Sequence, residues 1–149
     1  MKYLRKFESH IKHSDPISLN HPLKEFSKEL ENIIKNAEIK NTEVRRYFNE
    51  DQSITIKIFE THESILAEEI LKFKIWNNDT HIFINIFFSR WKLEKMTDFV
   101  EYIRQKTMKY NSYDKPFRIN FYFKKSEANT ILKILKEYET QIQANKYNL

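Results

Sequence analysis

The chain of 149 residues contains no glycine, although average usage would supply about ten. Glycine lets the backbone adopt positive φ and lets a ligand approach it closely. The phosphate-binding loop GxxxxGK(S/T), the dinucleotide turn GxGxxG and the nucleophile elbow GxSxG all depend on it. Composition alone therefore excludes these three kinds of site, and the turns of this protein must be made by residues such as Asn, Asp and Ser.

Cysteine is also absent, so disulfides and thiolate metal sites are excluded. The pair His10 and His13 lacks a third ligand at fixed spacing, and we expect neither a metal ion nor a cofactor. No apolar run approaches the roughly 18 residues that a membrane span needs, and no apolar segment follows the basic N-terminus as it would in a signal peptide. We therefore expect a cytoplasmic protein without membrane contact.

The net charge of +5 is unevenly distributed along the chain. Between Tyr102 and Lys125 there are seven basic residues, opposed only by Asp114. Such a bias can attract an anionic partner. The alternative is an AT-rich genome, which the many Lys, Ile and Asn residues indicate and which enriches lysine whatever the function.

Hydrophobic periodicity changes from helical to alternating and back along the chain, which predicts one α+β domain over residues 1–149. The expected order is α-α-β-β-β-β-α-β-α, a mainly antiparallel sheet of about five strands with about four helices. Helices are predicted over 3–11, 23–37, 93–103 and 126–142, and strands over 44–48, 53–59, 66–76, 80–88 and 117–123. For the first helix the alternative is a strand over 2–7. The last strand follows a helical crossover, which also permits a parallel neighbour.

One set of apolar residues is expected to form the core between helices and sheet: Phe26, Leu30, Ile56, Phe73, Ile84, Phe99, Phe121 and Leu135. Because side chains alternate along a strand, the opposite face of the sheet, here named the reverse face, is then fixed by parity. It is predicted to carry a mixture of cations and aromatic rings, which we take as the binding residues: Lys57, Lys72, Lys74, Trp76, Phe83, Phe87, Arg118, Tyr122 and Lys124. The same parity places Ile70, His81, Asn85 and Asn120 there. The alternative is that helices cover Phe83 and Phe87.

The predicted strand 80–88 leads through Ser89–Lys92 into a helix, a junction where backbone N–H groups can receive an anion. Ser89 is equally suited to be the N-cap of that helix. The element order over about residues 22–142 is similar to that of the acyl-CoA-dependent N-acetyltransferase fold, which holds a pyrophosphate at such a junction. That family's loop reads (R/Q)xxGx(G/A), whereas this chain has RWKLEK from Arg90, without the glycines. The resemblance implies a degenerate acetyltransferase-like domain.

Three hypotheses about function follow. The first is a non-enzymatic protein-binding module, such as a small inhibitor, immunity or adaptor protein, whose partner has an acidic surface. The second is a nucleic-acid-binding protein, because cations interleaved with aromatic rings suit phosphates and stacked bases. The third is the acetyltransferase-like domain. The absence of a catalytic constellation favours the first.

Overall fold

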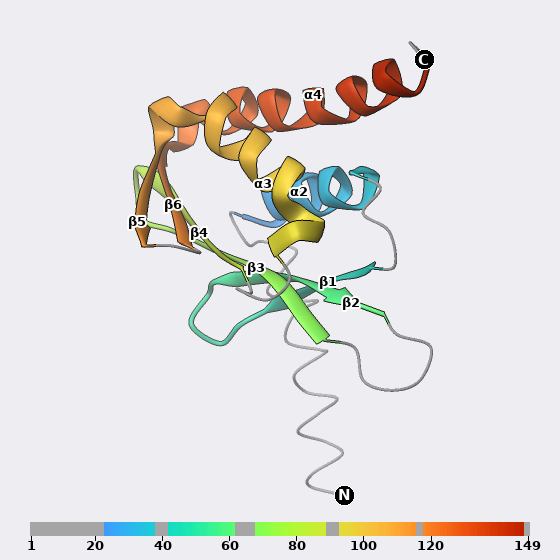
Figure 1. Cartoon of the computed structure of the whole chain (residues 1–149). Coiled ribbons are helices and arrows are strands. Elements are labelled where there is room, and N and C mark those ends of the chain that lie inside the picture. Colours follow the sequence, from blue (N-terminus) through green and yellow to red (C-terminus); the bar gives the residue numbers. More distant parts are fainter. Residues whose placement is uncertain (1–22, 38–41, 62–67, 89–92, 116–117, 148–149) are drawn as a thin grey trace, which may run out of the picture.

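A computed structural model describes residues 23–37, 42–61, 68–88, 93–115 and 118–147 (Figure 1). The predicted helix over 3–11, the pair His10 and His13, and the junction Ser89–Lys92 lie outside the described residues. Within these ranges the chain forms a sheet with helices packed on one of its faces. The α+β class predicted from the sequence is confirmed.

The described part of the chain contains six strands and three α-helices. The helices are α2 (Lys24–Asn36), α3 (Leu93–Lys106) and α4 (Ala128–Tyr147). The strands are β1 (Thr42–Phe48), β2 (Ile54–Glu60), β3 (Glu68–Asn77), β4 (His81–Phe88), β5 (Asn111–Lys115) and β6 (Arg118–Lys124). In the sheet they lie in the order β1-β2-β3-β4-β6-β5, and every neighbouring pair is antiparallel.

The sequence-based prediction misses β5 and leaves the direction of β6 open. The β5 sequence, NSYDK, is short and polar, so it carries no hydrophobic alternation from which a strand could be predicted. β6 is antiparallel to both β4 and β5. The crossover through α3 therefore leads to β5, which points the same way as β4, and β6 then returns between the two. The parallel neighbour that the sequence permitted for the strand over 117–123 is therefore not found.

The helices cover one face of the sheet and enclose the core with it (Figure 1). Antiparallel register aligns four apolar side chains in one row across β2, β3, β4 and β6, each no more than 3% exposed: Ile54, Ile75, Ile84 and Phe121. All eight residues predicted to form the core are buried. Because the core takes every second residue of each central strand, it leaves the alternate side chains to the reverse face.

Two hairpin turns are made without glycine. Between β1 and β2, Gln52 takes a φ of 70°, and its amide donates to the Asn49 carbonyl at 3.1 Å. Between β3 and β4, the Asn78 side chain accepts hydrogen bonds from the backbone amides of Thr80 and His81, at 2.9 and 2.7 Å. Side-chain hydrogen bonds of this kind replace part of the local geometry that glycine would otherwise allow.

Candidate binding site

The structure places all nine predicted binding residues on the reverse face, whereas α2, α3 and α4 lie on the other (Figure 1). The register arranges the face in three rows across β3, β4 and β6. The rows are Trp76, Phe83 and Tyr122; Lys74, Asn85 and Asn120; and Lys72, Phe87 and Arg118. Lys57 on β2 lies beside Lys72, and the exposed Lys124 lies opposite His81.

One residue assigned to this face by parity, Ile70, is not available to a partner. It is only 1% exposed. The register of β2 with β3 shifts here, because Ile58 pairs with Leu71 while Phe59 pairs with Glu69. The bulge takes Ile70 out of the simple alternation, and no period-two pattern could have predicted it.

Aromatic side chains form a continuous cluster at one end of the face. Trp76 stacks on Phe83 with ring centroids 5.3 Å apart and planes 6° apart. Tyr122 contacts Phe83 at 5.0 Å, and His81 stacks on Tyr122 at 4.4 Å with planes 5° apart. Tyr122 is 55% exposed. The sequence places His81 on this face but not among the nine predicted binding residues. Its contact with Tyr122 is a diagonal one between β4 and β6, which a single sequence does not specify.

The middle row is polar. The Asn85 amide group donates a hydrogen bond to the Asn120 side-chain oxygen on the neighbouring strand. Lys74 lies next to Asn85, and its ammonium is 3.8 Å from the Asp51 carboxylate in the β1–β2 turn. This row lies between the aromatic cluster and the Phe87 row. A ligand that spans the three rows would therefore contact aromatic, polar and cationic side chains.

The third row holds two cations around one ring. The Lys72 ammonium lies 4.9 Å from the centroid of the Phe87 ring, and the Arg118 guanidinium carbon lies 4.8 Å from it. Since β3 and β6 flank β4, the two cations approach this ring from opposite sides. Cation–π contacts of this kind are favourable but leave the positive charge in place.

Neither of these two cations is neutralised by an acidic side chain of the described residues. Lys57, by contrast, is paired with Glu69 at 3.2 Å. The Nε atom of Arg118 is shielded from solvent and has no hydrogen-bond acceptor in the described part of the chain. Because Nε is shielded from solvent, an incoming ligand cannot reach it, and an anion would respond to the charge of the guanidinium group as a whole. The Phe87 row therefore has the chemistry of an anion-binding position.

Within the described ranges, no three His, Asp or Glu side chains gather as metal ligands would. Nor is any helix there long and apolar enough to span a bilayer. Comparisons with protein-family models, with curated proteins and with solved structures found no match. The function must therefore be inferred from the chemistry of the chain's own surface.

Proposed function

We propose that this chain is a cytoplasmic, non-enzymatic protein-binding module that uses the reverse face to bind a partner with an acidic surface. The class includes small inhibitors, immunity proteins and adaptors. The observation that carries the proposal is the Phe87 row, where Lys72 and Arg118 flank one ring and no acid of the described chain compensates them. Beside it lies a partly exposed aromatic cluster. Trp, Tyr and Arg are the residues enriched at the energetic centres of protein interfaces.

The stacking of the rings favours a protein over a nucleic acid. Trp76 and Phe83 cover one face of each other, and so do His81 and Tyr122. A platform for bases offers ring faces to the ligand, whereas these pairs have already used one face each. An acidic protein, by contrast, can bind through ring edges, apolar contacts and positive charge, without an open ring face. The observation that supports the nucleic-acid alternative is the exposure of Tyr122.

The experiment uses Trp76 as a reporter, because it lies on the reverse face and the chain has only one other tryptophan, Trp91. In the Trp91→Phe variant, an acidic peptide of alternating Glu and Leu should change Trp76 fluorescence saturably. The isosteric Gln and Leu peptide should not. Equal responses to the two peptides would show that charge does not select the ligand and would overturn the proposal.

An oligo(dT) titration distinguishes the alternative. The logarithm of the binding constant for single-stranded DNA falls steeply and linearly with the logarithm of the salt concentration. The Tyr122→Ala substitution should weaken it by about 1–3 kcal/mol if a base stacks there. Our proposal would be replaced by the nucleic-acid alternative if oligo(dT) binds more tightly than the acidic peptide. In that case Tyr122→Ala should show this loss, and Tyr122→Phe should restore binding.

A further inference from the structure

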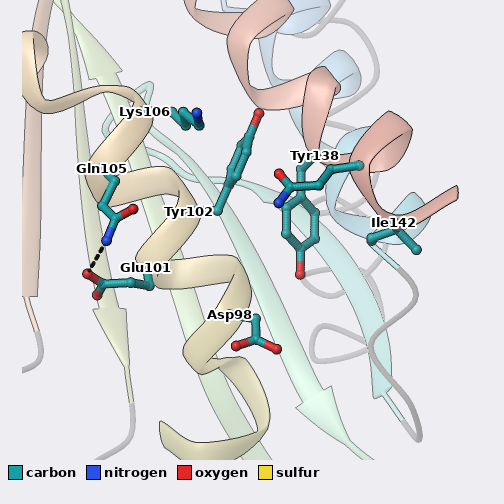
Figure 2. A pocket seen from close by; sticks show the side chains of 8 residues that line it. Asp98, Glu101, Tyr102, Gln105, Lys106, Tyr138 and Ile142 are labelled. Carbon is teal, nitrogen blue, oxygen red and sulfur yellow. Dashed lines mark hydrogen bonds between the residues drawn. The ribbon is translucent and has the colours of Figure 1, made fainter. Parts of the chain in front are cut away.

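A pocket of about 400 Å³ lies in the helix layer, between α3 and α4 (Figure 2). Ligand-binding pockets begin at about 300 Å³, so its size suits a small molecule or one side chain. It belongs to the layer on the opposite side of the sheet from the reverse face. Its lining comes from both helices: Asp98, Glu101, Tyr102, Gln105, Lys106, Tyr138, Gln141 and Ile142.

The aromatic wall of the pocket is held in place by the fold. The Tyr102 hydroxyl donates to the Ile134 carbonyl of α4 at 2.8 Å, and this residue is 8% exposed. The rings of Tyr102 and Tyr138 contact each other at 4.9 Å, and Tyr138 also packs on Phe99 at 5.1 Å. Both rings are therefore positioned before any ligand arrives, which reduces the entropic cost of binding.

The two carboxylates of the pocket differ in what surrounds them. Glu101 accepts hydrogen bonds from Arg104 and from Gln105, and the Arg104 guanidinium holds the pKa of this carboxyl below its ordinary value. Asp98 has no hydrogen bond or ion pair with the described residues. Burial raises the pKa of the Tyr138 hydroxyl, and the negative charge of Asp98 raises it further. The end of the pocket near Asp98 is thus negative.

The opposite end carries Lys106, but the Glu137 carboxylate also acts there: burial and the negative charge of Glu137 both raise the pKa of the Tyr102 hydroxyl. Lys106 follows Asp98 by eight residues on α3, about 12 Å along a helix, and Figure 2 shows Tyr102 between them. An elongated ligand that lies along α3 would therefore meet a carboxylate at one end and an ammonium at the other.

We propose that this pocket binds an organic monocation, an ammonium group on an apolar stem, with the ammonium at Asp98 and the stem against Tyr102 and Tyr138. The carboxylate supplies the counter-charge, and the two tyrosine rings supply apolar contact and cation–π attraction. The same chemistry is offered by a free alkylamine and by the lysine side chain of a peptide. This site is independent of the proposed function of the reverse face.

The test follows the tyrosine ring signals of the full chain by NMR while ligands are added at neutral pH. n-Butylammonium should produce saturable shifts of Tyr102 and Tyr138, and n-butanol, which has a similar shape without the charge, should bind at least about tenfold more weakly. Nα-acetyl-lysine amide tests the peptide source, and tighter binding than n-butylammonium would identify it.

Two substitutions complete the test. Asp98→Asn should weaken n-butylammonium about tenfold or more, whereas Asp79→Asn, the same change in the exposed β3–β4 turn, should have no effect. Equal binding of n-butanol and n-butylammonium, or unchanged affinity in an Asp98→Asn protein that melts like the wild type, would overturn the proposal.

Discussion

Trp76 and Phe83 stack across β3 and β4 with their ring planes 6° apart. The pair is directly opposed in the register of the two strands, and each ring limits the rotamers of the other. Large aromatic residues that are already ordered lose little conformational entropy when a partner binds. The reverse face therefore presents a prearranged aromatic surface beside two cations, Lys72 and Arg118, that pair with no acid in the described ranges.

Charge reversal of the Phe87 row should abolish binding of an acidic partner. In the double variant Lys72→Glu and Arg118→Glu, two flanking cations become anions, and the interaction changes from attraction to repulsion. Binding of the acidic peptide is measured by Trp76 fluorescence in the Trp91→Phe background. The matched control is Lys133→Glu with Lys136→Glu on α4, which makes the same change in net charge on the helix layer and should bind normally.

The melting temperature of the double variant should show that its loss of binding is not caused by unfolding. Neither cation of the Phe87 row is fully buried, and partly exposed charges contribute little to the free energy of unfolding. The double variant should therefore melt within a few degrees of the control, a shift that corresponds to about 1 kcal/mol or less in a domain of this size. Retained binding in a folded double variant would show that the partner does not use this row.

Replacement of Ile84 should be costly. This side chain is 2% exposed on β4, between Ile75 and Phe121, where the sheet can relax little around a cavity. Ile84→Ala should lower the free energy of unfolding by about 2–5 kcal/mol, and Ile84→Val by about 0.5–1.5 kcal/mol. Denaturant melts measure both. A loss below about 1 kcal/mol for the alanine variant would contradict the central position of Ile84.

The turn between β1 and β2 offers a stabilising substitution. Gln52 takes a φ of 70°, which is strained for a side chain with a Cβ atom and unstrained for glycine. Gln52→Gly should raise the free energy of unfolding by roughly 0.5–1 kcal/mol, and Gln52→Ala should not. Thermal and denaturant melts check the difference. A glycine variant no more stable than the alanine variant would show that the turn is not strained at this residue.

Asp51 should make stability depend on pH in the acid range. Its carboxylate accepts hydrogen bonds from the hydroxyl and the backbone amide of Ser53, and these lower its pKa from 3.8. A lowered pKa stabilises the fold above the unfolded-state value, and this contribution is lost as the pH falls through the folded-state pKa. The wild type should exceed Asp51→Asn in stability at pH 6, by less than about 1 kcal/mol because the group is exposed, and match it at pH 2. A difference in stability between the two proteins that persists at pH 2 would show that the charge of Asp51 is not its cause.

Much of the fold could be predicted because the central strands alternate so regularly. In 117–123 the apolar period of two is long enough to fix both the strand and its buried face, whereas 80–88 is apolar on both faces and its pattern fixes the strand more firmly than the face. β5 could not be predicted, because its five residues, four of them polar, are held in the sheet by pairing with β6 rather than by a pattern of their own. The bulge at Ile70 likewise arises from pairing between strands.

Only part of the candidate sites could be predicted from the sequence. Parity placed Lys72, Phe87 and Arg118 on one face, but their assembly around one ring depends on register, which a single sequence does not specify. The pocket between α3 and α4 was not predicted at all. Its wall forms where Tyr102 and Tyr138 meet from helices separated in the chain by two strands, and no local pattern signals that meeting.

The insertion of β6 between β4 and β5 has a consequence for synthesis. When β4 leaves the ribosome, one edge of this strand, rich in Ile and Phe, has no partner until β6 follows. At about 5–20 residues per second this interval lasts seconds, and an unpaired apolar edge is a template for aggregation. The nascent chain thus passes through a vulnerable stage that ends only when β6 has also left the ribosome, and messages truncated before the codon of Arg118 should yield insoluble product.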